Sequence, residues 1–389
     1  MEDHPMTPRV SYGTFDFGLT AEQEERAARL HRDSIICDLL YQGPYSPDAW
    51  TREMIDDIDA QGSDDLWQAF RYIADRITSG TLPGFRELVG QSGIINNMGG
   101  CLLKDKESLR DYGDFLDRQL ETFPWIRRAR TAGDIRAAKR DGGQVVWGIC
   151  QITQLRPGDL DVIDLAHDMG VLHIADCAYN VMTYIGTGCT ERYDAGLSRF
   201  GLEFVRRCNE VGVIVDTAHS GRQTTLDACA ASAAPVIASH TSAAALFPHD
   251  RAKSDEEIRA IAASGGVIGV YVVPFFLAPP GDTGASIELV LDHMDYVAEL
   301  VGWQHVAIGT DWPMALPHHV QHRAFSGKLE EFGFREEHAI DVTQTLAGFR
   351  DYRDMVNITR GLVSRGYGDE QIRGILGENF LRVFEAVNG

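Results

Sequence analysis

The chain has 389 residues, of which 44% are hydrophobic and 24% are charged. This composition is typical of a soluble globular protein with a sizeable core and excludes an intrinsically disordered chain. Lysine and arginine number 36 against 57 aspartates and glutamates, which gives a net charge of −21. Because so acidic a chain repels phosphate backbones and anionic membrane surfaces, we expect no nucleic-acid or membrane partner.

The amino-terminal segment, MEDHPMTPRVSYG, has neither a basic head nor an apolar stretch of signal-peptide length. The sequence also contains no apolar run long enough to cross a bilayer. We therefore expect a cytoplasmic protein. The seven cysteines are scattered without CxxC spacing, which favours reduced thiols over a disulfide framework.

In chain order, residues 1–33 are predicted to form an arm and a polar helix from about Thr20 to Arg32. Eight short apolar runs bounded by turn residues then predict strands that are buried on both faces. Helix-like segments such as GLEFVRRCNEVG lie between them, so the sheet should be parallel, and eight repeats predict a closed (β/α)8 TIM-type barrel. The runs are 34–40, 92–97, 145–152, 171–177, 213–218, 235–240, 267–273 and 305–311.

Two long segments, roughly 41–91 and 98–144, separate the first three runs and are charged and helix-like. We expect them to form helical insertions that cover one rim of the barrel. The last segment, 357–387, has helical periodicity interrupted by glycine, which predicts a terminal helix pair. Since no linker or repeat is found, residues 34–389 are predicted to form one domain.

Polar residues at the carboxyl ends of the strands are the first candidates for chemistry, because this is where barrels of this type place their active sites. Asp216 and His219 follow the fifth run, His240 closes the sixth and Asp311 closes the eighth. A single histidine at a strand end is more often structural. Two on adjacent strand ends, with a carboxylate across the barrel, form the ligand set that zinc prefers.

Four motifs contain or follow these residues: VDTAHSG, IASHTSAAAL, PHDRAKSDEEI and IGTDWP. In order and spacing they resemble the signatures of the fifth, sixth and eighth strands of the membrane (renal) dipeptidase family of metallopeptidases. The stretches YNVMTYIGTGCTERYDAGLSRFG and NITRGLVSRGYGDEQIRGILGENFLRVF are similar to bacterial members of that family. The resemblance is dense over residues 145–389 and thin before them.

The resemblance implies roles for individual residues. It makes His219 and His240 ligands of one metal ion, and Asp311 a ligand of the other ion that also transfers a proton. Arg251 falls where the family binds the carboxylate of the substrate, and a planar guanidinium suits that task. Tyr179 lies where other members place a histidine that polarises the scissile carbonyl. Without the resemblance, Tyr179 would be interpreted as a buried aromatic residue and Arg251 as a solvated charge.

The sequence departs from the family at the first and third strands. Where the family has a metal-binding His-x-Asp, this chain has Leu40, Tyr41 and Gln42, and Gln151 stands in place of a bridging glutamate. Two divalent ions would bring four positive charges against one carboxylate, Asp311, and burying them would be severely unfavourable. A register change could instead bring Asp38 or Cys150 into the site.

We therefore expect one divalent ion, zinc, held by His219 and His240, with Gln151, Asp311 or water completing its shell. Tyr41, Gln42 and Asn180 are expected to join Arg251 in binding the substrate.

The leading hypothesis is a metal-dependent hydrolase of a small dipeptide-like or N-acyl amino acid amide whose substrate carries a free carboxylate. One alternative is a different reaction on the same barrel, such as lactam opening, a lyase step or decarboxylation. Another is a catalytically silent relative retained for binding. A homodimer is left open as an assembly.

Overall fold

The computed structural model describes residues 11–43, 50–61, 66–96, 101–152, 154–175, 177–313 and 316–389. Two residues of the predicted strand runs, Asn97 and Asp176, lie outside these ranges. No helix in the described part of the chain is long and apolar enough to cross a membrane.

A parallel sheet of seven strands forms the centre of the molecule, and six of the eight predicted runs supply most of it. Its order is β1-β4-β5-β6-β7-β8-β9, so from β4 onward strands that follow one another in sequence are neighbours in space. The strands are β1 Cys101–Leu103, β4 Gly148–Ile152, β5 Val171–Ala175, β6 Ile214–Asp216, β7 Val236–Thr241, β8 Ile268–Val270 and β9 Val306–Ile308. A separate parallel pair is made by β2 Ile126–Arg128 and β3 Gln144–Val146.

The first two predicted runs, 34–40 and 92–97, connect β9 to β3 through backbone hydrogen bonds. They continue the circular order of strands around the barrel. The backbone N–H of Leu39 donates to the carbonyl of Ile308 at 2.9 Å. Ile95 donates to Ile36 at 2.8 Å, and Val145 donates to Ile95 at 2.9 Å. Together with the seven-stranded sheet, these bonds give the arrangement of a (β/α)8 barrel, which confirms the predicted fold class.

Side chains replace part of the hydrogen-bond ladder in the first run, which explains why it does not form a regular strand. The buried carboxylate of Asp38 accepts from the backbone N–H of Leu40 at 3.2 Å and of Thr310 at 2.9 Å. The Asn96 side chain accepts from the Asp38 N–H at 3.0 Å and donates to its carbonyl at 2.8 Å. Buried backbone groups are thus satisfied without a continuous ladder.

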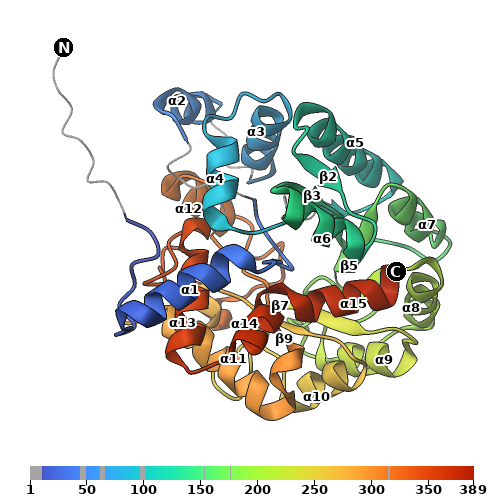
Figure 1. Ribbon diagram of the computed structural model, residues 1–389. Helices are drawn as coiled ribbons and strands as arrows, with labels where there is room; N and C mark the ends of the chain where they lie inside the picture. Colours follow the sequence, from blue (N-terminus) through green and yellow to red (C-terminus); the bar gives the residue numbers. More distant parts are fainter. Residues whose placement is uncertain are drawn as a thin grey trace.

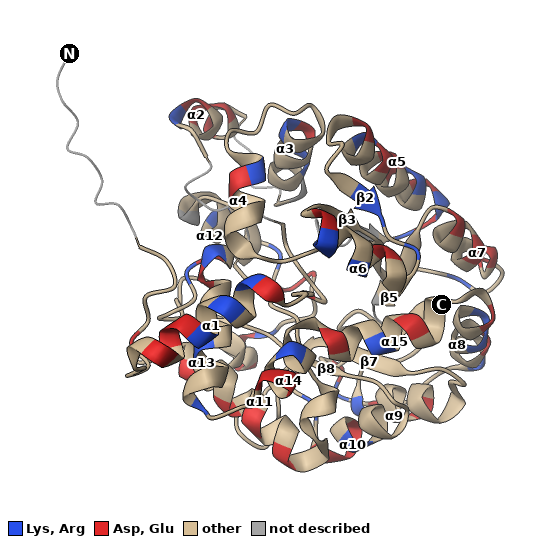
Figure 2. Cartoon of the chain, viewed as in Figure 1, with Lys and Arg blue, Asp and Glu red and all other residues tan. Residues whose placement is uncertain are grey.

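Helices form the outer layer, as Figure 1 shows for the arc from α7 to α11. Those between strands are α6 Ala132–Asp141, α7 Asp161–Asp168, α8 Arg199–Val211, α9 Arg222–Ala231, α10 Asp255–Ala263 and α11 Ile287–Val301. Both signs of charge are spread over these helices (Figure 2). This distribution keeps the strongly charged residues outside and the apolar strands inside.

The predicted insertions are mainly helical, but the second also contains β1 of the central sheet and β2 of the separate strand pair. The first holds α2 Arg52–Ala60, α3 Leu66–Thr78 and α4 Phe85–Ser92, and the second holds α5 Lys106–Thr122 together with α6. After β9 come α12 His318–Ser326 and the short 3-10 turns η4 Glu336–His338 and η5 Tyr352–Asp354. Two further 3-10 turns are η2 Pro274–Phe276 after β8 and η3 Trp303–His305 before β9.

Terminal helices close the end of the barrel where the strands begin. The predicted first helix is α1 Ala21–Asp33, which packs on α13 Met355–Ser364. The carboxyl-terminal segment continues through α14 Asp369–Arg373, a π-helical turn η6 Gly374–Glu378 and α15 Asn379–Asn388. The ring of Trp147, just before β4, lies 5.7 Å from that of Phe380 on α15. The opposite end of the barrel, where the strands end, is therefore the end that remains for a site.

Candidate active site

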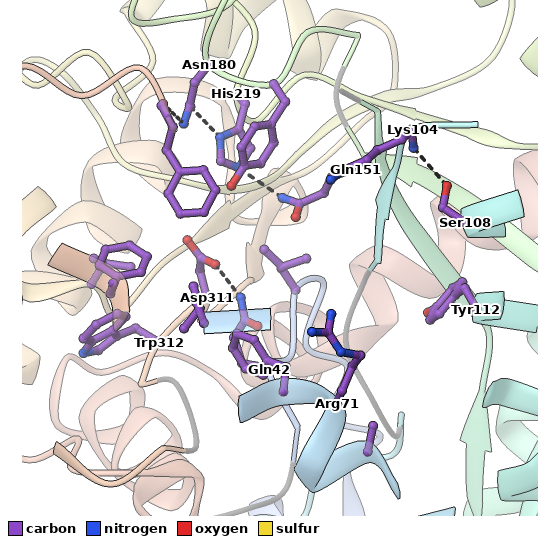
Figure 3. A pocket seen from close by; sticks show the side chains of 18 of the residues that line it. Gln42, Arg71, Lys104, Ser108, Tyr112, Gln151, Asn180, His219, Asp311 and Trp312 are labelled. Carbon is purple, nitrogen blue, oxygen red and sulfur yellow. Dashed lines mark hydrogen bonds between the residues drawn. The ribbon is translucent and has the colours of Figure 1, made fainter. Parts of the chain in front are cut away.

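A cavity of about 550 Å³ lies at the carboxyl ends of the strands. Its volume is in the range that holds a small-molecule ligand. Seven of the nine predicted site residues line it: Gln42, Gln151, Tyr179, Asn180, His219, Arg251 and Asp311. In Figure 3, Gln42 and Asp311 approach one another, and His219 lies between Asn180 and Gln151.

The local structure of β7 brings His240 to the edge of this site. The pairing of β7 with β8 is irregular between Ala238 and Thr241, which includes the histidine. Bulges of this kind redirect side chains beside active sites. Gly269 and Gly309 leave room for the displaced backbone, because a Cβ atom at either position would overlap the carbonyl oxygen of Ser239.

The tautomer of His219 follows from its hydrogen bonds. Asn180 donates its side-chain N–H to the carbonyl of Phe332 at 2.8 Å, so its amide oxygen must be the atom that lies 2.6 Å from Nδ1 of His219. His219 therefore donates from Nδ1 and carries its lone pair on Nε2. This is the ligating form of a histidine whose second ring nitrogen is oriented by a neighbour.

His240 meets His219 beneath the cavity. The two Nε2 atoms lie 2.7 Å apart, and Nδ1 of His240 lies 2.7 Å from the Ser239 hydroxyl. Because a hydroxyl can donate or accept, Ser239 permits either neutral tautomer of His240. Burial, assisted by the charge of Arg251, holds the pKa of both imidazoles well below the ordinary value. Both rings are neutral, as metal binding requires.

Gln151 and Asp311 lie beside the two histidines. The Gln151 amide nitrogen lies 3.2 Å from Nε2 of His219, and a carboxylate oxygen of Asp311 lies 4.0 Å from Nε2 of His240. The Gln42 side chain donates to Asp311 at 2.9 Å. Burial raises the pKa of Asp311 to about 6, although Arg251 and this hydrogen bond oppose the rise. The carboxyl group is thus poised for proton transfer near neutral pH.

The donor atoms gathered at this site could hold a metal ion. Among the described residues, no three His, Cys, Asp or Glu side chains gather closely enough to hold a metal. One ion could take Nε2 of both histidines and, once its amide is turned, the oxygen of Gln151. A second ion would face Leu40, which lines the same wall and offers no ligand atom.

Asp216, the remaining candidate at a strand end, has a structural role beneath the site. Its carboxylate lies 2.8 Å from Nε2 of His173, and both side chains are fully buried. It also accepts from the backbone N–H groups of Ala218 and Ser239, each at 2.9 Å. Asp216 therefore fixes the strand ends that carry the two candidate ligands.

Arg251 is 1% exposed and lies in the cavity wall. Its guanidinium donates to the carbonyl of Ala218 and, at 3.3 Å, to the carbonyl of His240. It also approaches Nε2 of His219 to 3.3 Å and lies over the ring of Phe276. The charge predicted to bind a substrate carboxylate thus also holds the backbone at both histidines.

Lys253 holds the other side of the His219 turn. Its ammonium group donates to the carbonyl of Ser220 at 2.7 Å and to the hydroxyl of Thr225 at 3.0 Å, and it pairs with Glu257 at 3.1 Å. Burial alone would raise the pKa of Glu257, but Lys253 and hydrogen bonds from Ser254 keep it below the ordinary value. Buried cations therefore clamp the carbonyls on both sides of His219.

Replacing Lys253 by methionine is expected to lower the free energy of unfolding by about 3–5 kcal/mol, because the buried carboxylate of Glu257 then lacks its cation. The midpoint of urea unfolding measures this loss. Adding Glu257→Gln to the same variant should recover part of the stability. Equal stability of the single and double variants would show that the pair is not coupled.

Tyr41 and Tyr179 lie in different environments. Tyr179 lines the cavity and stacks on the His219 ring, with centroids 4.3 Å apart. Tyr41 was predicted to contact the substrate, but it is 1% exposed and is absent from the described cavity wall. Its ring packs edge-on against Tyr352 at 4.5 Å. Because side chains alternate along an extended segment, Leu40 and Gln42 face the cavity while Tyr41 points into the core.

Several cavity residues were missed by the sequence analysis. Aromatic side chains of loops form much of the wall, including Phe275 and Phe276 of η2, Trp312, and Phe332. The only signal for them in the sequence is the concentration of aromatic residues in segments such as PFF after β8. The insertion helices α3 and α5 also reach the cavity, for example through Arg71.

Comparison with known proteins identifies the family. The sequence model of the membrane dipeptidases, peptidase family M19, matches residues 109–343 and 339–389. The chain belongs to this family. The match confirms the resemblance seen in the sequence motifs.

Two curated relatives in this family are named dipeptidases. Dipeptidase tcpJ of Claviceps purpurea (strain 20.1) is 29% identical over 277 residues, which cover 70% of this chain and 58% of tcpJ. Dipeptidase verJ of Clonostachys rogersoniana is 30% identical over 225 residues, which cover 58% of this chain and 48% of verJ. The chain therefore spans about half the length of these relatives.

A solved structure of an amidohydrolase from Pseudomonas aeruginosa has the same fold. It superposes with a TM-score of 0.70 at 24% identity and covers 93% of this chain and 99% of its own. This similarity supports the barrel architecture of the membrane dipeptidase family for the present chain.

Proposed function

We propose that this protein is a hydrolase that cleaves the amide bond of a small dipeptide-like or N-acyl amino acid substrate with the help of a single zinc ion. The observation that carries the proposal is that His219, His240, Gln151 and Asp311 lie close together at one end of the cavity. Membership of a family of metallopeptidases agrees with this chemistry.

His219 and His240 would hold the ion, with the Gln151 amide as a third donor. When bound, the ion would lower the pKa of a water molecule and polarise the substrate carbonyl. Leucine and glutamine stand where the family resemblance places charged ligands, so Asp311 is the one carboxylate beside two neutral histidines. The positive charge of Arg251 nearby further disfavours a second dication.

The protein groups account for proton transfer and orientation. Asp311 would accept a proton from the attacking water and deliver it to the leaving amine, a role that suits its raised pKa. The Tyr179 hydroxyl would donate a hydrogen bond to the carbonyl oxygen as negative charge develops on it. Arg251 would attract the free carboxylate of the substrate, with Gln42 and Asn180 shaping the adjoining wall.

A different reaction on the same barrel is the second candidate, and the bond from Gln42 to Asp311 favours it. A neutral amide there restrains the carboxylate through one hydrogen bond. Such a site could abstract a proton in a lyase step, supply the proton that replaces the lost CO2 in a decarboxylation, or open a lactam. A substrate panel that includes these classes separates the two candidates.

Metal analysis tests the main proposal. After dialysis against zinc and removal of free metal, we expect at most one equivalent per chain and hydrolysis of some N-acyl amino acids. His219→Ala should lose both, whereas His319→Ala should lose neither, because His319 is half-exposed and pairs with Asp59. Two equivalents would contradict the single-ion site, and no binding with no hydrolysis would favour a silent relative.

Replacing Asn180 by glycine is expected to weaken zinc binding about 10–100-fold, because His219 then loses the acceptor that fixes its tautomer. Glycine tolerates the positive φ of 57° at this position. Asn180→Asp is the matched control, since it keeps an oxygen acceptor for Nδ1. Competition titration with a chelator measures the affinity, and equal losses in both variants would show that orientation of His219 is not the cause.

A further inference from the structure

The cavity extends well beyond the strand ends, and its far wall is made by the insertion helices. On α3 the lining residues are Leu66, Phe70, Arg71, Ala74 and Asp75, and on α5 they are Ser108, Asp111, Tyr112, Phe115 and Arg118. These positions recur at intervals of three and four residues, so each helix turns one continuous face toward the cavity. The far wall of the cavity is therefore formed by a continuous face of each helix and not by one isolated residue.

The far wall combines flat apolar groups with positive charge. Phe70, Tyr112 and Phe115 supply the aromatic rings. In Figure 3 the guanidinium of Arg71 points from α3 into the cavity, on the side facing Gln42 and Gln151. A planar guanidinium beside aromatic rings suits a ligand that carries a carboxylate on a flat apolar group.

Charge at this wall differs in sign from the rest of the molecule. The lining residues of α3 and α5 include two basic side chains, Arg71 and Arg118, and two acidic ones, Asp75 and Asp111. Lys104, just before α5, also lines the cavity and brings the sum for the described residues to three basic against two acidic side chains, a net positive charge. The whole chain has a net charge of −21. A positive patch within an acidic protein attracts an anionic ligand toward the cavity.

Part of this wall lies outside the match to the family model. The match to the family model begins at residue 109, so α3, Lys104 and Ser108 precede it. Arg251, at the other end of the cavity, already donates to two backbone carbonyls and lies 1% exposed. Arg71 is exposed, and in Figure 3 its guanidinium is aimed into the cavity, where an anionic ligand group could reach it.

We infer that the far wall is a second anion-recognising subsite and that the substrate reaches it. The substrate would be an N-acyl amino acid whose acyl group is aromatic and carries a distal carboxylate, with the ring between Phe70, Tyr112 and Phe115 and the carboxylate on Arg71. This inference rests on the proposed function for the identity of the reacting end. It makes the substrate longer than a simple dipeptide and anionic at both ends.

Calorimetric binding to the chelator-treated protein tests the subsite without turnover. The probes are N-acetyl-alanine, N-(phenylacetyl)alanine and two longer compounds, N-(4-carboxyphenylacetyl)alanine and N-(4-carboxyphenylbutanoyl)alanine. At least one carboxylated probe should bind about 10–100-fold more tightly than N-(phenylacetyl)alanine, as expected for a charged hydrogen bond. Arg71→Met should abolish this preference and leave the affinity for N-acetyl-alanine unchanged, while Arg71→Lys should keep part of it.

Arg86→Met is the matched control, because Arg86 lies over Trp125 on the neighbouring helix α4 and is not among the described lining residues. It should leave the preference intact. Retention of the preference in Arg71→Met, or failure of every probe to bind, would overturn the subsite. Binding with the expected preference but no hydrolysis by the zinc-loaded protein would instead overturn the proposed reaction and leave the subsite standing. Hydrolysis of N-acetyl-alanine with no preference among the probes would overturn the subsite and leave the proposed reaction standing.

Discussion

Replacing Asp311 by asparagine is expected to lower kcat/KM about 10²–10⁴-fold for any amide that the protein hydrolyses, because this change removes the group proposed to move the proton. Asparagine has nearly the same shape and can still accept from the Gln42 side chain, which bonds Asp311 at 2.9 Å. The backbone there has a φ of 56°, which asparagine tolerates well. The loss should therefore be chemical rather than structural.

Steady-state kinetics, with the midpoint of thermal unfolding measured in parallel, check this expectation. Asp341→Asn is the control, since Asp341 bonds the exposed Thr343 and is not among the described residues that line the cavity. A variant that loses activity while keeping its unfolding midpoint and its zinc content would support proton transfer by Asp311. A decrease of less than tenfold would assign that role to another group.

The fold was largely predictable because its signals are local. Apolar runs such as VLHIADC and amphipathic segments such as GLEFVRRCNEVG each contain most of the information that selects a strand or a helix. They became β5 and α8 in the structure. The first run was harder, because the Asn96 side chain, 58 residues away in sequence, bonds both the backbone N–H and the carbonyl of Asp38 in place of a regular ladder.

From the pattern of strands alone, the site was predictable only where residues fall at strand ends, and the family resemblance added Tyr179, Asn180 and Arg251. His219, His240 and Asp311 converge because parallel strands end at one rim, which the alternation of elements already implies. The supporting contacts come from distant segments that no local pattern connects. Asn180 faces His219 from the loop after β5, and Arg71 reaches the cavity from an insertion before the second run. The direction of Tyr41 likewise depends on its packing against Tyr352.

Introducing the ligands that the family resemblance places at the first and third strands should create a site for two ions. This change is the strongest test of what the differences at these positions do. The change is Leu40→His, Gln42→Asp and Gln151→Glu. All three side chains line the same cavity, and Gln42 and Gln151 already contact Asp311 and His219. Two new carboxylates beside Asp311 bring the local acidic charge from −1 to −3, which two dications can offset.

We expect the triple variant to bind a second equivalent of zinc and to hydrolyse L-alanyl-L-alanine about 10²–10³-fold faster than the unaltered protein, which should act poorly on it. Losing one stabilising group at a developing oxyanion commonly costs this much, and the second ion would supply such a group. Without metal, the clustered carboxylates should repel one another and lower the unfolding temperature, so zinc should raise that temperature more in the variant than in the parent.

The matched control is Leu40→Asn, Gln42→Asn and Gln151→Asn, which alters the same three positions without adding charge. It should gain neither metal nor activity. Binding of a second ion with no gain in hydrolysis would mean that the remaining shell does not orient the new ligands productively. If the unaltered protein cleaves simple dipeptides at about ten per second or more, a rate typical of efficient enzymes, then a second ion is not needed. The substitutions at the first and third strands would then have left the family's reaction unchanged, and the expectation that the altered site acts poorly on simple dipeptides would fail.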